Sequence, residues 1–138
     1  MAKTARVIWL EKQQFVGIDS SKHSVVLSAQ DEENATGINP SDLLLLALGG
    51  CTSYDVVTIL KKSRQDVTGC EVRLQAERAP SDPKVFTRIH MHFLVRGRAL
   101  RPRLVENAIH LSHEKYCSAS VMLGKTAEIT HDYEIVDG

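Results

Sequence analysis

One segment constrains the fold of this chain more than any other. Residues 43–54 carry no charge, and Asn39 and Pro40 just before them are typical of a helix start. We expect a helix from this pair to about Lys61 or Lys62, whose charges favour a helix C-terminus. Residues 43–48 are apolar on every side of such a helix. A helix of this kind must be buried all round, so it is predicted to lie at the centre of the fold.

The same helix carries a cysteine in an unusual setting. Cys51 follows Gly49 and Gly50, each of which costs roughly 1 kcal/mol inside a helix. Such glycines indicate that another backbone or a ligand approaches closely. Tyr54 and Asp55, one turn later, place polar groups on the side of the sulfur. By residue type alone Cys51 is a core residue, but this setting favours a reactive thiol.

Alternating patterns predict the sheet. Short strands are expected around residues 7–9, 15–18 and 25–29, and longer ones around 70–76, 89–95 and 127–135. A second helix is expected from near Pro102 to residues 115–117, and a helical turn through 121–123 that stops at Gly124. Runs of strands separated by helices predict an α+β fold with a largely antiparallel sheet and no βαβ repeat. We expect a single domain over residues 1–138.

Charge and cysteine content exclude several classes of function. Lysine plus arginine equals aspartate plus glutamate, at 17 each. We therefore expect neither a nucleic-acid partner nor a membrane partner. The chain has three cysteines, an odd number, and we see no secretory apolar segment near its start. Both observations argue against a framework of structural disulfides, and we expect the protein in the cytoplasm.

The remaining thiols and histidines are weaker candidates. Cys117 lies at the expected end of the second helix, where it can serve as a partner thiol for Cys51. Cys70 alternates inward with its apolar neighbours and is predicted to be core. His90 and His92 share a polar strand face without an apparent third metal ligand, so we expect solvent-facing side chains. No metal or other cofactor is expected.

Several stretches resemble the OsmC/Ohr family of thiol peroxidases, and within it the YhfA-like branch. The resemblance rests on the runs at residues 37–44, 47–52, 85–87, 111–118 and 128–134, and it covers nearly the whole chain. It implies an OsmC-like fold assembled as an intertwined homodimer, with the long helices packed centrally and the sites at the interface. It also implies that Cys51 attacks an organic hydroperoxide and that Cys117 resolves the resulting sulfenic acid as a disulfide. An external dithiol then reduces this disulfide.

The chain departs from that family pattern at the groups that activate the thiol. Catalytic members carry a glutamate directly after the Asn-Pro pair, where this chain has Ser41, with Asp42 one position later. They also use an arginine from the N-terminal half, and no arginine stands between Arg6 and Arg64 here. Lys22 and His23 are the candidate replacements, although neither offers the two-pronged hydrogen bonding of arginine.

Three functions remain open from the sequence. The first is a redox protein that reduces organic hydroperoxides, or carries out related thiol–disulfide chemistry, through Cys51 and Cys117. The second is a non-catalytic dimer that binds a small thiol-reactive or other molecule, which the missing glutamate and arginine favour. The third is a carrier of sulfur or acyl groups on Cys51.

Overall fold

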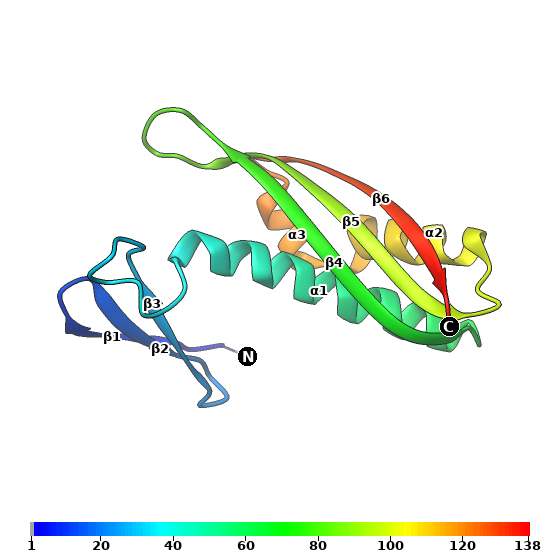
Figure 1. The fold of residues 1–138 in the computed structure, drawn as a ribbon, viewed down its shortest axis with the longest axis horizontal. Coiled ribbons are helices and arrows are strands. Elements are labelled where there is room, and N and C mark those ends of the chain that lie inside the picture. The colour runs from blue at the N-terminus through cyan, green and yellow to red at the C-terminus, as the bar shows by residue number, and fades with distance from the viewer. Residues whose placement is uncertain (1) are drawn as a thin grey trace. The chain divides into compact units, whose positions relative to one another are not determined.

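The protein alternates groups of strands with helices, as the sequence predicts. The computed structural model describes residues 2–138 (Figure 1). Its elements are β1 (Arg6–Glu11), β2 (Gln14–Ile18), β3 (Ser24–Ser28), α1 (Pro40–Lys62), β4 (Asp66–Arg78), β5 (Phe86–Arg98), α2 (Pro102–Leu111), a π-helical turn η1 (Ser112–Tyr116), α3 (Ser118–Leu123) and β6 (Glu128–Asp137). The α+β class is therefore confirmed.

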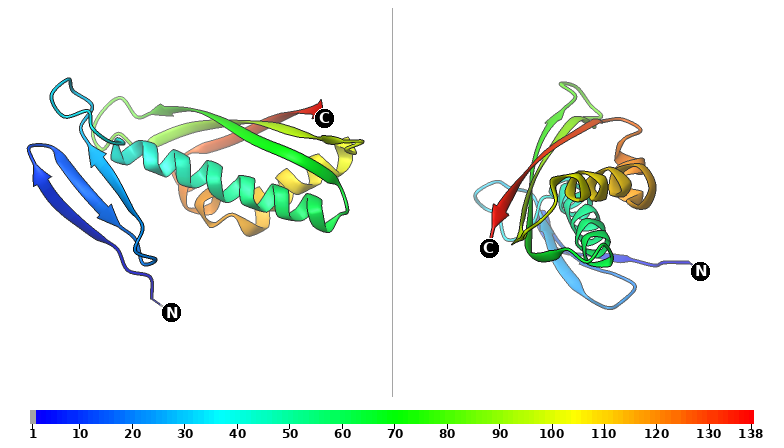
Figure 2. Two further views of the ribbon diagram at one scale, coloured as in Figure 1. Left: turned by 60° about the horizontal axis from the view of Figure 1, so that its bottom comes forward. Right: turned by 90° about the vertical axis from the view of Figure 1, so that its right-hand side faces the viewer.

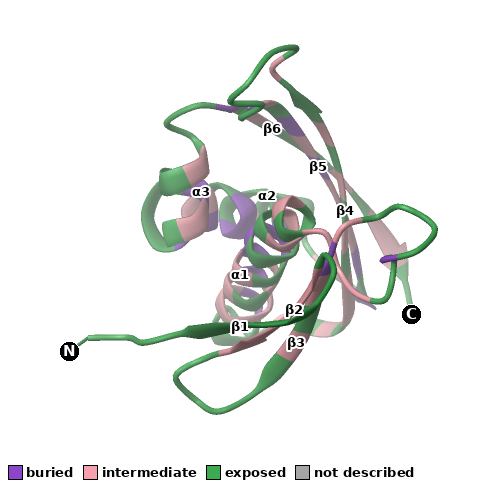
Figure 3. Cartoon of the chain, turned by 90° about the vertical axis from the view of Figure 1, so that its left-hand side faces the viewer, coloured by how far each residue is buried: buried purple, intermediate pink, exposed green. Residues whose placement is uncertain are grey.

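The chain divides into two compact units, residues 1–46 and 47–138. The boundary falls inside α1, and a single domain over residues 1–138 stays a prediction. In the N-terminal unit β1, β2 and β3 form an antiparallel sheet in that order. The buried residues among positions 2–46 are Ser28 and Asn34, both polar. Figure 3 shows the three strands largely as exposed or intermediate. This unit therefore has no apolar core in the single chain.

The C-terminal unit contains a three-stranded sheet in the order β4-β5-β6. β4 runs antiparallel to β5, whereas β6 runs parallel to it. The expectation of a largely antiparallel sheet without a βαβ unit is therefore wrong for β6, because the helical segments between β5 and β6 form a parallel crossover. Alternation of side chains is the same in parallel and antiparallel strands, so the pattern did not reveal this.

The core of this unit lies between the sheet and the helices, which run along one face of it (Figure 2). The central strand β5 contributes Ile89, Met91, Phe93 and Val95, all at most 2% exposed. Facing residues of α1 and α2 are equally buried: Leu48, Val56, Leu60, Val105, Ala108 and Ile109. The inward face of β4 is half-buried instead, because β4 is an edge strand.

Helix α1 has the predicted bounds but not the predicted burial. Leu44 and Leu46 are 49% and 56% exposed, so the helix is not buried all round in the single chain. By length and composition α1 is apolar enough to cross a membrane, a test that the core helix of a soluble protein also passes. Full burial of Leu48, Val56 and Leu60 supports the core interpretation.

Candidate active site

The position of Cys51 follows from the packing of α1 in the C-terminal unit. Cys51 is half-buried in the middle of the helix. Gly49 is buried, and a Cβ there would lie 2.9 Å from Cδ1 of Leu74 on β4. That glycine is therefore explained by a side chain of the sheet rather than by a ligand. A Cβ at Gly50 would meet nothing within 4 Å, so this glycine is not explained by a contact in the single chain.

Cys117 is positioned by a break in the second helix. The sequence predicts a continuous helix to residues 115–117, whereas α2 ends at Leu111 and a π-helical turn follows. The Cys117 N–H closes this turn by donating to the Ser112 carbonyl oxygen at 2.8 Å. Its backbone then becomes extended, and its Sγ accepts a hydrogen bond from the Ser120 N–H at 3.3 Å. Cys117 is 1% exposed. Single π-helical turns of this kind are frequent at functional sites.

The two thiols meet a carboxylate. Cys51 Sγ, Cys117 Sγ and a carboxylate oxygen of Asp55 all lie within 4.8 Å of one another. The buried Ser112 hydroxyl donates to Asp55 Oδ2 at 2.9 Å and thereby joins α1 to the π-helical turn. We call Cys51, Asp55 and Cys117 the thiol–carboxylate cluster. All three cysteines of the chain are in the free thiol form.

The surroundings of Cys51 favour its thiol over its thiolate. Partial burial raises the pKa of Cys51, and the hydrogen bond with the Cys117 side chain raises it further. The Ala119 backbone N–H opposes these effects, whereas the charges of Cys117 and Asp55 add to them. The carboxylate of Asp55, one helical turn away, therefore disfavours the thiolate of Cys51. This result agrees with the missing activating groups noted in the sequence.

The structure places the other predicted site residues in the N-terminal unit. Ser41 is the second residue of α1, and its hydroxyl donates to Asn39 Oδ1 at 2.6 Å, while the adjacent Asp42 is exposed. Lys22 and His23 belong to the turn between β2 and β3, and the His23 N–H donates to Asp19 Oδ1 at 2.8 Å. A role for these four residues at the thiols stays a prediction.

His23 also borders a hollow in the N-terminal unit. This hollow has a volume of about 350 Å³, and Arg6 lines it together with His23. Two side chains able to carry positive charge therefore lie around one hollow of this unit.

Cys70 is separate from the thiol–carboxylate cluster. It is half-buried on β4, and burial raises its pKa, while a hydrogen bond with Ser53 of α1 lowers it. Its inward orientation is as predicted, but its burial is incomplete because β4 is an edge strand.

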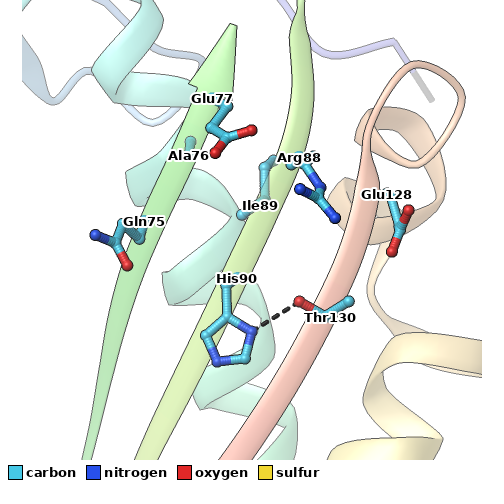
Figure 4. Close-up of a pocket in the computed structure, with 8 residues that line it drawn as sticks. All are labelled: Gln75, Ala76, Glu77, Arg88, Ile89, His90, Glu128 and Thr130. Carbon is cyan, nitrogen blue, oxygen red and sulfur yellow. Dashed lines mark hydrogen bonds between the residues drawn. The ribbon is translucent and has the colours of Figure 1, made fainter.

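The polar strand face carries hydrogen bonds that the sequence did not reveal. His92 Nδ1 lies 2.7 Å and His90 Nε2 3.1 Å from the same oxygen, Oδ1 of Asp132 on β6. Hydrogen bonds with Asp132 and then Glu134 raise the pKa of His92. A hollow of about 360 Å³ beside His90 is lined by residues of all three strands and contains no cysteine (Figure 4). This face is therefore distinct from the cluster.

The sequence did not predict the hydrogen bonds that neighbouring residues make with the thiol–carboxylate cluster. The available signal was Ser112, a polar residue that directly follows Leu111 within the segment expected to be the second helix and that the structure buries fully. Nothing in the sequence indicated that the N–H groups of Ala119 and Ser120 act on the sulfurs. Ser120 also has a buried hydroxyl without a hydrogen-bond partner among the residues that the structure describes.

Comparison with known proteins establishes the family. Residues 30–132 match the family model described as OsmC-like protein. The chain belongs to the OsmC-like protein family. Protein YhfA of Escherichia coli (strain K12) is 46% identical over 132 residues, which cover 96% of this chain and 97% of YhfA. The predicted family, including its YhfA-like branch, is therefore confirmed.

Solved structures agree with the OsmC-like fold. An OsmC-like protein from Mycoplasma pneumoniae matches with a TM-score of 0.85 at 14% identity, covering 99% of this chain and 98% of its own. The organic hydroperoxide resistance protein OhrB of Bacillus subtilis matches with a TM-score of 0.65 at 14% identity, covering 97% and 98%. At this identity both show the fold alone. Membership of the family suggests redox chemistry related to peroxides.

Proposed function

We propose that this OsmC-like protein reduces organic hydroperoxides through Cys51 and Cys117. The observation that carries the proposal is the approach of the two free sulfurs within 4.8 Å, although Cys51 lies on α1 and Cys117 lies between η1 and α3. A disulfide requires the two sulfurs to come to about 2.05 Å, so only a short movement separates the reduced pair from the oxidised one. The hydroperoxide resistance of the fold relative OhrB agrees with this substrate class.

The reaction balances in three steps. Cys51 Sγ attacks the distal peroxide oxygen, the O–O bond breaks, and the thiol and hydroperoxide become a sulfenic acid and an alcohol. The Cys117 thiol then attacks the sulfenic sulfur, which forms the Cys51–Cys117 disulfide and releases water. An external dithiol reduces this disulfide by thiol–disulfide exchange and is itself oxidised to a disulfide. We propose that this cycle runs in the cytoplasm, where such dithiols are kept reduced.

A cavity beside the cluster can hold the organic part of the substrate. Its volume is about 350 Å³, and Asp55 is one of its lining residues. Ile59, Leu111 and Tyr116 supply apolar surface, while polar lining comes from Thr58, Lys62 and Ser63. Asp55 therefore borders both the sulfurs and a space of suitable chemistry for an alkyl or aryl group.

Mass spectrometry of the oxidised protein tests the peroxidase. Reduced protein is treated with a stoichiometric organic hydroperoxide, and we expect a Cys51–Cys117 disulfide together with one equivalent of alcohol. Cys117→Ser is expected to stop at the Cys51 sulfenic acid, which dimedone traps. Cys70→Ser is the matched control and should react like the unmodified chain. Free thiols at both positions after treatment, under conditions that oxidise a known peroxidase, would refute the proposal.

The raised pKa of Cys51 favours a second candidate, a non-catalytic dimer that binds small molecules. A thiol that stays protonated at neutral pH is a poor nucleophile. In this case Cys51→Ser keeps ligand binding intact, whereas peroxide treatment leaves the sulfurs unchanged. If cells that carry Cys51→Ser keep the phenotype of cells with the unmodified protein, the second candidate is supported over the first.

We propose a homodimer as the working form. Leu44 and Leu46 are about half exposed on α1, and Val7, Trp9 and Leu10 on β1 are more than half exposed. Several large apolar side chains exposed within one unit are typical of a protein that associates through that unit. Sedimentation at micromolar concentration should give twice the chain mass of 15.3 kDa. A stable folded monomer under these conditions would contradict the proposal.

A further inference from the structure

The thiol–carboxylate cluster has the donor atoms of a transition-metal site. Thiolate sulfur and carboxylate oxygen bind Zn²⁺ at about 2.3 and 2.0–2.2 Å in tetrahedral sites. These lengths place neighbouring ligand atoms roughly 3.5–3.8 Å apart. The three donor atoms here all lie within 4.8 Å of one another before any ion is added. A contraction of at most about 1.0–1.3 Å would bring them to coordinating distance.

We propose that reduced Cys51, Asp55 and Cys117 bind one Zn²⁺ or a similar thiophilic divalent cation. Three protein ligands leave a fourth position open for water or for an added small thiol, as in other three-ligand zinc sites. The proposed site uses the same sulfurs as peroxide reduction but does not depend on that activity.

The contacts around the cluster match the outer hydrogen bonds of a metal site. The Ser112 hydroxyl donates to Asp55 Oδ2 at 2.9 Å, which orients the carboxylate. The Ser112 side of this hydrogen bond is fully buried, whereas Asp55 is half-buried. The Ser120 N–H donates to Cys117 Sγ, and the Ala119 N–H acts on Cys51 in the direction that favours thiolate. Such outer partners orient ligands and strengthen metal binding.

Metal binding at the cluster is coupled to proton release. Asp55 places a carboxylate within 4.8 Å of both thiol sulfurs. A divalent ion stabilises two thiolates and a carboxylate side by side, because its positive charge offsets theirs. Binding to two thiols and one carboxylate displaces the two thiol protons. At neutral pH we therefore expect about two protons released for each ion bound.

A bound metal would slow peroxide chemistry at the same sulfurs. Coordination draws electron density from both thiolates and holds the two sulfurs apart as ligands of one ion, so a disulfide forms only when the ion is released. This one consequence rests on the proposed function. Metal bound at the cluster would then keep the pair reduced until a chelator or a competing ligand removes it.

Metal titration of the reduced, metal-free chain without a histidine tag tests the site. Co²⁺ is expected to give sulfur-to-metal charge-transfer absorption and tetrahedral visible bands that saturate at one ion per chain. Zn²⁺ should displace it, and calorimetry in buffers of different ionisation enthalpy should count about two protons. Cys51→Ser and Cys117→Ser should abolish the charge-transfer band or weaken binding at least 100-fold. Ser112→Ala should weaken it about 10- to 100-fold.

Two variants serve as matched controls. Cys70→Ser removes the third thiol, and His92→Ala removes a histidine from the polar sheet face, where it lies 2.7 Å from Asp132. Both are expected to leave binding unchanged. Loss of the cobalt spectrum in either control, or its retention in Cys51→Ser or Cys117→Ser, would overturn the proposal. Should a variant fail to fold by circular dichroism, oxidation of the unmodified chain to a Cys51–Cys117 disulfide, or alkylation of both sulfurs, must abolish binding.

The result can be separated from the outcome for peroxide reduction. Metal binding is measured without peroxide, and disulfide formation is measured after chelation. Absence of metal binding with normal disulfide formation refutes the metal site alone. Metal binding without peroxide reactivity refutes the proposed function alone. If both proposals hold, saturating Zn²⁺ should slow disulfide formation at least tenfold, and chelation should restore it.

Discussion

The two units of this chain differ in how they are stabilised. In residues 47–138, the central strand β5 has four apolar side chains that are at most 2% exposed, on the side of α1 and α2. In residues 2–46 the buried residues are two polar ones, Ser28 and Asn34. Trp9 on β1 is 66% exposed, although tryptophan is highly buried on average in folded proteins. The C-terminal unit has its own core, whereas the N-terminal sheet has none in the single chain.

This difference indicates a division of roles. Both sulfurs and Asp55 lie in the unit that has a core, where packed helices hold their positions. A sheet of three short strands without a buried face is marginal in water. The proposed second copy of the chain would cover the exposed apolar residues of the N-terminal unit.

The largest expected effect comes from charges on the exposed leucines of α1. Leu44→Asp with Leu46→Asp should weaken self-association by about 10²–10⁴-fold, since burying a leucine contributes roughly 1.5–3 kcal/mol. Sedimentation over a range of concentrations measures this change. The matched control is Val121→Asp with Met122→Asp, two exposed apolar residues of α3 in the other unit. Equal loss of association in the control would remove the distinction between the two surfaces.

A core substitution should behave differently. Phe93→Ala removes a fully buried ring from β5 and should lower the free energy of unfolding by about 3–5 kcal/mol. Urea denaturation measures this loss. Trp9→Ala in the same experiment should show a loss that grows with protein concentration, because its ring is covered only on association. A concentration-independent loss at Trp9 would mean that the chain covers this residue by itself.

Substitution of charged residues in each unit should show which unit controls the reactivity of Cys51. Asp55→Asn removes a negative charge beside Cys51, so alkylation of Cys51 near neutral pH should accelerate roughly fivefold, as expected for about 1 kcal/mol. Lys22→Ala and His23→Ala should slow it if the N-terminal unit supplies the activating cation. Peptide-resolved mass spectrometry follows Cys51 alone. Unchanged rates in both N-terminal variants would dismiss Lys22 and His23 as activators.

The raised pKa of Cys51 predicts that the stability of the fold depends on pH. Because the folded state raises the pKa of Cys51, the folded chain retains the thiol proton where the unfolded chain loses it. The contribution of this proton to the free energy of unfolding is complete below the unfolded thiol pKa of about 8.5. It is lost as the pH rises through the pKa of Cys51 in the folded state. Urea denaturation between pH 7 and 10 should show a fall in stability that is smaller in Cys51→Ser. A steeper fall in that variant would contradict this assignment.

The smallest expected effects distinguish the paired glycines. Gly50→Ala should stabilise the chain by about 0.5–1 kcal/mol, because alanine favours helix and its Cβ meets nothing within 4 Å. Gly49→Ala gains the same propensity but presses its Cβ on Leu74, so it should be less stable than Gly50→Ala. Thermal unfolding compares the pair. Destabilisation by Gly50→Ala would show that another surface covers this position.

Local patterns were sufficient for much of the fold. Asn39-Pro40 at one end and Lys61-Lys62 at the other predicted the bounds of α1, because caps and end charges act within a single turn. Alternation predicted the inward face of β5, because it depends only on the pleat. The parallel pairing of β6 was missed, because the pairing partner and its direction depend on where the crossover helices place the strand.

For the site, the sequence by itself determined the two thiols and a carboxylate one helical turn beyond the first. Only the tertiary structure decided that they meet, because the π-helical turn at Ser112–Tyr116 aligns Cys117 with α1. It also decided the electrostatics of Cys51, since the pKa of a thiol depends on burial and on charges brought close by folding. Residue type is local information, whereas contact between distant segments depends on the packing of the whole unit.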